Sequence, residues 1–290
     1  MLPYVYLISS VLFVASTNII GSVYNRKNAG RRGLAPLYNL LLLSAVVVCW
    51  TVMFLTDRSY DITVIPYALV FCLCYTLAMV GTINALKTGP VMLTSLFGQL
   101  SLIGVSVWGF FFWDEAFSAL TGVGLVLTAV ALWLCLYRGR SGETAKFTPS
   151  WFGYVLLVFL GNAGCSIAQR TQQVDFHGQY GNFMMLTATS LSLIVFLVVY
   201  LVSDKSDSRE IARRSWYLPM LAGLSNAMLN LFVIFMAISP LSPSLIYPVI
   251  AVGSLIVITL VSLFVFKDKM KWWQWCGVAL GALATGILSL

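Results

Sequence analysis

Polar side chains inside long apolar segments are the residues of this sequence best suited to bind a ligand. In two segments they recur with the spacing of one helix face. The first stripe is Asn162, Ser166, Gln169 and Gln173, and the second is Gly223, Asn226 and Asn230. Because an amide or hydroxyl in hydrocarbon needs a hydrogen-bond partner, such stripes either line a polar pathway or bond neighbouring helices. We expect them to line a pathway.

Further polar side chains fall at a similar depth in other apolar segments. Those near the centre are Tyr75, Gln99, Asn162 and Asn226, and those close to that depth are Ser16 and Ser190. A hydrogen bond between two helices would explain any one of them alone. Their convergence at one depth favours a shared cavity, and we predict that they bind a small-molecule substrate there.

One basic residue and several aromatic residues are further candidates. Arg170 lies one turn beyond the first stripe, where it could clamp a carboxylate or phosphate, or extend its guanidinium to the membrane interface. Four aromatic side chains could stack on a planar or quaternary-ammonium ligand. They are Trp50, Tyr75, Trp108 and Tyr247. Pro248 follows Tyr247 and is expected to kink the helix and free a backbone carbonyl beside it.

The groups that enzymes and metal sites need are missing from the same segments. The ten acids all map to predicted loops or span ends: Asp57, Asp61, Asp114, Glu115, Glu143, Asp175, Asp204, Asp207, Glu210 and Asp268. The single histidine, His177, lies in a predicted loop, and the six cysteines are expected to be small buried side chains. We therefore expect no enzyme, no cofactor, no metal site, and no cation exporter that depends on a buried acid.

The composition fixes the environment of these residues. Of 290 residues, 60% are hydrophobic and only 9% are charged, and the mean hydropathy is +0.91. A soluble domain carries roughly 25% charged residues, because water covers most of its surface. The chain is therefore expected to be an all-α polytopic membrane protein, with the lipid bilayer as its surroundings.

Apolar runs long enough to cross the hydrocarbon number ten. They cover residues 2–23, 35–56, 63–86, 90–111, 117–137, 149–171, 179–202, 216–237, 243–266 and 272–290. Runs such as Leu40 to Trp50 are apolar all round, whereas barrel strands would alternate. No basic stretch precedes the first run, so we expect a retained helix and not a secretory signal.

The basic residues predict the orientation of the spans, because Lys and Arg favour cytoplasmic loops. The odd-numbered loops hold fifteen: Arg26, Lys27, Arg31, Arg32, Lys87, Arg138, Arg140, Lys146, Lys205, Arg209, Arg213, Arg214, Lys267, Lys269 and Lys271. The other two are Arg58 and Arg170. Both termini are therefore predicted outside the cytoplasm. Topology and anionic lipid account for the net charge of +7, so no nucleic acid partner is expected.

Tryptophans at span ends are expected to form an interfacial belt, namely Trp113, Trp151, Trp216, Trp272, Trp273 and Trp275.

An internal repeat divides the chain into halves of five spans, residues 1–142 and 143–290. A shift of 153 positions aligns the fourth and fifth spans with the ninth and tenth. The matched pairs are Pro90 and Pro243, Leu93 and Ile246, Ser101 and Ser254, Glu115 and Asp268, Gly124 and Gly277, and Ala131 and Ala284. Because five is odd, the second half must cross the membrane in the opposite direction. Inverted repeats of this kind are typical of secondary transporters.

These features resemble the drug/metabolite transporter superfamily, in its ten-helix EamA-like branch. The resemblance rests on Ala85-Leu86-Lys87-Thr88-Gly89-Pro90, on its second copy from Ala237 to Pro243, and on the hairpin acids Glu115 and Asp268, each followed by a glycine-bearing helix. It implies eight helices around a central cavity, with the fifth and tenth helices outside. It leaves the substrate open.

We accordingly expect a secondary transporter that moves a small polar or amphipathic metabolite, such as an amino acid or nucleobase, by alternating access. The alternatives are capture of quaternary-ammonium or drug-like cations by aromatic side chains, and a non-transporting membrane scaffold. A monomer in a bacterial plasma membrane is expected, with sodium or another coupling ion left open.

Overall fold

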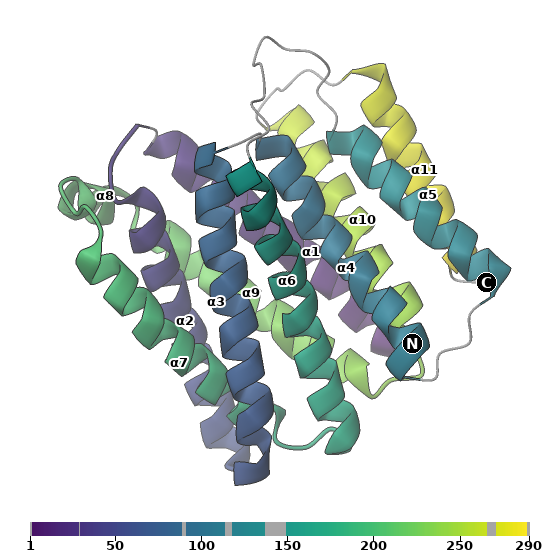
Figure 1. The fold of residues 1–290 in the computed structure, drawn as a ribbon, viewed down its shortest axis with the longest axis horizontal. Coiled ribbons are helices and arrows are strands. Elements are labelled where there is room, and N and C mark those ends of the chain that lie inside the picture. Colours follow the sequence, from purple (N-terminus) through teal and green to yellow (C-terminus); the bar gives the residue numbers. More distant parts are fainter. Residues whose placement is uncertain are drawn as a thin grey trace.

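The computed structural model describes residues 2–28, 30–88, 91–113, 118–136, 149–265 and 271–288, and these form helices and no strand (Figure 1). The elements are α1 (Leu2–Lys27), α2 (Leu34–Asp57), the 3₁₀ turn η1 (Ile62–Val64), α3 (Ile65–Thr88), α4 (Val91–Phe112), α5 (Ala119–Leu136), α6 (Pro149–Asp175), α7 (Gly181–Val202), α8 (Ser208–Ser215), α9 (Tyr217–Ala237), α10 (Pro243–Phe264) and α11 (Trp272–Leu288). The predicted all-helical class is confirmed.

Seven of these helices are long and apolar enough to cross a membrane, as expected of a polytopic membrane protein. They are α1, α2, α3 with the turn η1 before it, α6, α7, α9 and α10. Shorter apolar stretches lie in α4 and α5, at Phe97–Phe112 and Ala119–Leu134.

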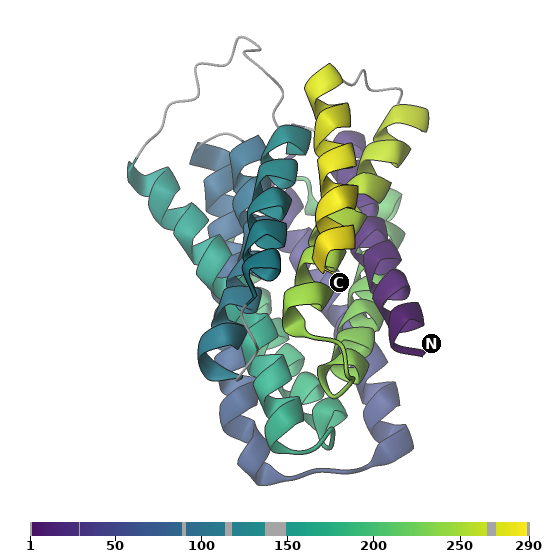
Figure 2. The same cartoon turned by 90° about the vertical axis from the view of Figure 1, so that its right-hand side faces the viewer.

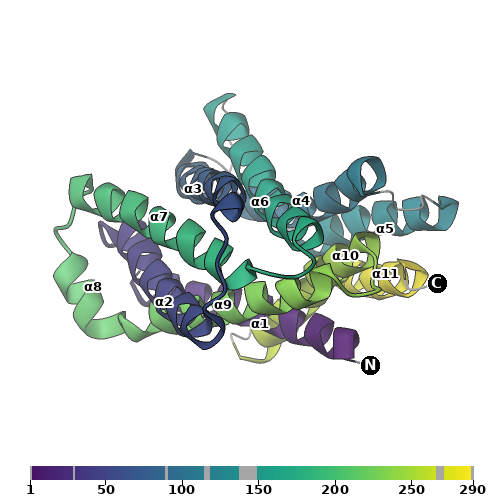
Figure 3. The same cartoon turned by 90° about the horizontal axis from the view of Figure 1, so that it is seen from below.

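The helices form an elongated bundle. Helices α2, α7 and α8 lie at one end of its long axis and α5 and α11 at the other (Figures 1 and 3). The beginning of α1 and the end of α11 lie on the same side of the bundle, where the labels N and C stand (Figure 2). The most extensive pairings are α3 with α6, α1 with α9, α5 with α11, and α2 with α7.

Glycines allow several of these pairs to approach closely. A Cβ atom added at Gly161 of α6 would lie 2.6 Å from the carbonyl oxygen of Cys74 on α3. On α9, a Cβ at Gly223 would collide with the backbone of Leu42 on α2, and Gly124 of α5 faces Leu288 of α11. Helices in lipid gain little from the hydrophobic effect between them, so van der Waals contact at small residues holds them together.

Several expectations need correction or lie beyond the described residues. Trp151 does not belong to an interfacial belt, because it is buried and its Nε1 donates a hydrogen bond to Oγ1 of Thr94 at 3.2 Å. The belt positions Trp216, Trp272 and Trp275 are exposed, as predicted. Helix α8 was not expected, since its eight residues are too few for a span. The boundary at 142/143 and these repeat and loop residues lie outside the described part: Pro90, Asp114, Glu115, Glu143, Lys267 and Asp268.

The described acids lie at helix ends, in connections or on α8, as predicted, and the described cysteines form no disulfide. Asp57 and Asp175 end their helices, and Asp61 caps η1 by accepting from the amide of Thr63 at 2.9 Å. That hydrogen bond and the one from the Thr63 hydroxyl lower the pKa of Asp61 below its ordinary value.

Replacing Gly161 by alanine is expected to destabilise the fold. The added methyl group would push α6 away from the backbone of α3, and overpacking of this kind costs about 1–3 kcal/mol. Gly153→Ala on the same helix is the matched control, because a Cβ there meets nothing within 4 Å. Thermal denaturation in detergent should show a lower midpoint for Gly161→Ala only; equal midpoints would contradict the close contact.

Candidate ligand-binding site

Five helices meet around an apolar cluster in the half of the bundle that ends at the α2–α3 and α6–α7 connections. Its buried members include Trp50 of α2, Phe71 of α3, Ala168 of α6, Met185 of α7 and Ala222 of α9. Tyr75 and Cys165 pack against the same cluster. Helices from both parts of the chain therefore contribute to one region.

Two polar groups in this cluster have no hydrogen-bond partner among the described residues. Nε1 of Trp50 is one, although the side chain is only 1% exposed, and the hydroxyl of Tyr75 is the other. The Tyr75 ring stacks on Phe71 with centroids 6.0 Å apart. A buried donor without a partner costs about 1–3 kcal/mol. These two groups are therefore the donors of this cluster whose hydrogen-bonding capacity the described residues leave unused.

An amide junction joins α6 to α9 beside this cluster. Nε2 of Gln169 donates to the carbonyl oxygen of Asn230 at 3.1 Å and lies 3.8 Å from the sulfur of Met185. The side chain of Asn230 donates to the carbonyl of Asn226 at 2.8 Å and lies 3.3 Å from its Oδ1. The two predicted stripes thus meet, through the helix–helix bond that the sequence had left as the alternative.

The end of the first stripe is used for packing. Gln173 is buried and its Nε2 donates to Oε1 of Gln172 at 2.6 Å, while Nε2 of Gln172 donates to the carbonyl of Gln179 at 2.8 Å. These bonds close the α6–α7 connection. Gln172 has no place in the predicted stripe, because its position one residue before Gln173 puts it off that face.

The remaining polar candidates are half-buried, and their side chains make no hydrogen bond to another described residue. They are Ser16, Gln99, Asn162, Ser166 and Ser190. Asn162 faces α4, because its Nδ2 lies 3.9 Å from the position that a Cβ on Gly98 would take. The structure therefore brings Asn162 to the α4–α6 contact, separate from the Gln169–Asn230 junction.

Arg170 and Tyr247 belong to a second cluster, at the contact of α6 with α4 and α10. The guanidinium carbon of Arg170 lies 5.1 Å from the ring centroid of Trp113, a cation–π arrangement. Trp113 packs with buried Tyr247 and with Val105 and Ala163. The sequence predicts Trp113 to be an interfacial residue. Its contacts with Arg170 and Tyr247 join residues far apart in the chain, so only the structure shows them.

An apolar cavity of about 630 Å³ lies on the other side of α6. Its lining includes Tyr67 and Val70 of α3, Trp108 of α4, and Phe159 and Ile167 of α6. At 3.6 residues per turn, Leu160, Ile167 and Thr171 of the lining face roughly 130–170° away from the polar stripe, whereas Phe159 lies about 50° from it. Val70 and Trp108 are exposed, so this cavity opens at the bundle surface, and Ala168 of its lining also belongs to the central cluster.

The chemistry of the site is that of hydrogen bonding and stacking. The described residues contain no group of three or more His, Cys, Asp or Glu side chains that could hold a metal ion. The described acids lie at helix ends, in connections or on α8, and one of them, Asp175, accepts a hydrogen bond from the hydroxyl of Tyr67, which packs against the first cluster and lines the apolar cavity.

Comparison with known proteins identifies a shared fold. No family model matches the chain, and no curated protein matches it. By structure, 29 chains of solved structures match this protein. One crystal structure superimposes with a TM-score of 0.74 at 12% sequence identity, covering 98% of this chain and 95% of that one. At this identity the likeness shows the fold over nearly the whole chain, and function has to be argued from the site.

Removing the Tyr75 hydroxyl is expected to leave the unliganded protein as stable or more stable. Tyr75→Phe deletes a buried donor that has no partner and keeps the stacking on Phe71, so the free energy of unfolding should rise by up to about 1 kcal/mol. Chemical or thermal denaturation measures the change. A loss above about 1 kcal/mol would mean that the hydroxyl is bonded within the protein.

The Gln169 amide should behave in the opposite way. Gln169→Leu removes the bond to the Asn230 carbonyl and should cost about 0.6–2 kcal/mol, the range for hydrogen bonds between helices in lipid. Ser166→Ala is the control on the same helix, because the structure assigns its hydroxyl no bond. If the two variants melt together, the Gln169–Asn230 bond does not join α6 to α9.

Proposed function

We propose that the protein is a secondary transporter that carries a small polar or amphipathic metabolite across the membrane through a central site. The observation that carries this proposal is the pair of buried, unpartnered donors, Nε1 of Trp50 and the hydroxyl of Tyr75, where five helices meet. A protein that only packed its helices would gain nothing from leaving such groups unbonded. A ligand that accepts from both would supply the missing partners.

The pairing of the helices supports a proposed architecture of ten spans in two inverted halves, 1–142 and 143–290. Exchange of the halves maps α3–α6 onto α9–α1, α4–α6 onto α10–α1, and α2–α9 onto α7–α3, and all six pairings occur. The pairs α2–α7, α4–α10 and α5–α11 map onto themselves and also occur. In such a fold the substrate site lies between the halves and opens alternately to each side.

Matched residues support the same duplication. Ser101 and Ser254 are both fully buried, and each hydroxyl donates to the carbonyl three residues earlier, at 2.6 and 3.1 Å. Ala131 and Ala284 are both buried where α5 meets α11. On this basis we propose membership of the drug/metabolite transporter superfamily, in its EamA-like branch. The basic loops support a plasma-membrane orientation with both termini outside the cytoplasm.

The site chemistry favours a small neutral, zwitterionic or planar substrate, such as an amino acid or a nucleobase. Trp50 and Tyr75 each offer a donor and a ring, and the Gln169 amide lies at the edge of the same cluster. The stacked rings of Phe71 and Tyr75 favour one second candidate, a quaternary amine held by cation–π contact. Such a ligand cannot accept a hydrogen bond through its ammonium group, which separates the two candidates experimentally.

The test is a thermal-stability screen of the purified protein against amino acids, nucleobases, quaternary amines and sugar phosphates. A ligand at a hundred times its dissociation constant stabilises the folded state by about 2.7 kcal/mol. We expect a nucleobase or amino acid to raise the melting midpoint, and Tyr75→Phe or Trp50→Phe to reduce that shift while retaining the fold. Uptake of the same compound into proteoliposomes then measures transport.

Ser192→Ala is the matched control, because Ser192 is a buried hydroxyl on α7 that already donates to the carbonyl of Ala188 at 2.9 Å. A shift with quaternary amines that survives Tyr75→Phe would favour the second candidate. No shift with any class, in protein shown to be folded, would contradict the proposed site and favour a scaffold.

A further inference from the structure

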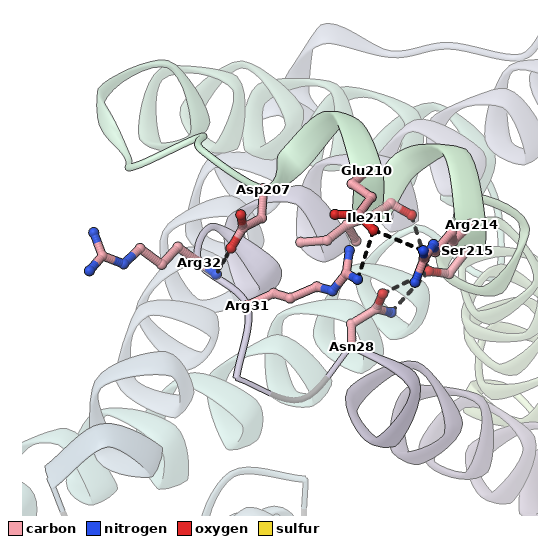
Figure 4. A network of polar contacts seen from close by, with 8 residues as sticks. All are labelled: Asn28, Arg31, Arg32, Asp207, Glu210, Ile211, Arg214 and Ser215. Carbon is pink, nitrogen blue, oxygen red and sulfur yellow. Dashed lines mark hydrogen bonds and ion pairs between the residues drawn. The ribbon is translucent and has the colours of Figure 1, made fainter.

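A polar network joins the α1–α2 connection to α8 (Figure 4). Along the helix axes it lies at the start of α2 and α9, whereas the candidate site lies toward the α2–α3 and α6–α7 connections. Oε1 of Glu210 lies 2.9 Å from Nη2 of Arg31 and 3.0 Å from Nη2 of Arg214. The hydrogen bond from Arg31, with a smaller contribution from the charge of Arg214, keeps the pKa of Glu210 below its ordinary value. Glu210 is therefore ionised at neutral pH, and both ion pairs are present.

Backbone and buried contacts extend the network on both sides of Glu210. The amide of Arg32 donates to Oδ2 of Asp207 at 2.8 Å, and Nη1 of Arg32 lies 3.3 Å from Oδ2 of Asp204. Nδ2 of Asn28 donates to Oγ of Ser215 at 2.9 Å, and both side chains are buried. The two segments are thus bonded along their length and not at one point.

The two segments also touch at their backbones. Gly33 has φ of +72°, and a Cβ added there would lie 2.5 Å from the carbonyl oxygen of Asp204 and 2.9 Å from Oγ of Ser208. Gly30 has a similar φ of +80°, but a Cβ there would meet nothing within 4 Å. The left-handed conformation favours glycine at both positions, whereas only Gly33 is required for the close contact.

An apolar cluster lies directly beneath the network. Tyr24, Leu37, Ile211 and Leu218 are buried against one another, and they come from α1, α2, α8 and α9. Ile211 is the apolar side chain by which the otherwise charged helix α8 reaches this cluster. With the network closed, Leu218 is only 7% exposed.

We propose that Asn28, Arg31, Arg32 and Gly33 of the α1–α2 connection form a clamp with residues 204–215, which closes this side of the bundle and separates when the bundle opens to that side. The clamp joins the first half of the chain to the second, as a gate between two moving halves must. Exposed ion pairs contribute at most about 1 kcal/mol each, so a clamp built largely from them can open reversibly. Its role in transport rests on the proposed function; its opening does not.

The clamp is tested by the reactivity of a cysteine placed at Leu218, in the full chain in lipid nanodiscs with the native cysteines replaced by alanine. A water-soluble maleimide should label Leu218→Cys slowly. Gly33→Ala should raise the labelling rate by about fivefold or more, the factor that corresponds to about 1 kcal/mol. Gly30→Ala, which carries the same φ strain without the collision, should leave the rate within about twofold.

Charge variants test the same contact independently of the glycines. Arg31→Glu should raise the labelling rate, and adding Glu210→Arg should lower it again, because the ion pair re-forms with its signs exchanged. Arg209→Glu is the matched control, since the structure assigns Arg209 no ion pair although it lies on the same exposed helix. The proposed clamp is wrong if Gly33→Ala and Arg31→Glu label at the same rates as their controls. It is also wrong if Leu218→Cys labels rapidly without any change in the clamp residues.

These measurements use no substrate, so the two proposals fail separately. If the clamp variants open while no compound shifts the melting midpoint, the clamp stands and the transport proposal falls. If a compound binds through Tyr75 while all labelling rates agree, the transport proposal stands and the clamp is overturned.

Discussion

Hydrocarbon offers a protein no hydrogen bonds, and the rest of this structure follows from that constraint. Every backbone group inside the bilayer must be bonded within its own segment, which leaves helices as the form of an apolar chain such as this one. The same constraint makes each polar side chain in a span significant. Gln169 meets it by donating to α9, and Trp151 meets it by donating to Thr94.

Within the five-helix cluster, Trp50 and Tyr75 are the exceptions on which the proposed site rests. Both donors are buried among Phe71, Ala168 and Met185 and have no hydrogen-bond partner among the described residues. Close glycine contacts such as Gly161 against α3 and Gly223 against α2 draw the helices together around these donors. The packing that stabilises the bundle therefore also shapes the region where a substrate would be held.

The two ends of the bundle differ in the physics of their contacts. Around Trp50 the contacts are apolar and lie within the hydrocarbon. At the α8 end they are ion pairs and hydrogen bonds, and water and salt weaken each of them. Helices α1, α2 and α9 contribute side chains to both regions, so the proposed clamp and the candidate site share these three helices.

The sequence by itself determined the all-helical class and the seven helices that are long and apolar enough to cross a membrane, because hydropathy acts locally along the chain. It also marked Gln169, Asn226 and Asn230 as one group, since helical periodicity fixes which side chains share a face. Only the tertiary structure decided that Gln169 bonds to Asn230 while Asn162 turns toward α4, that Trp113 lies under Arg170, and that α8 reaches the α1–α2 connection. These contacts join residues tens to hundreds of positions apart, and their geometry depends on how the helices cross, which no local pattern records.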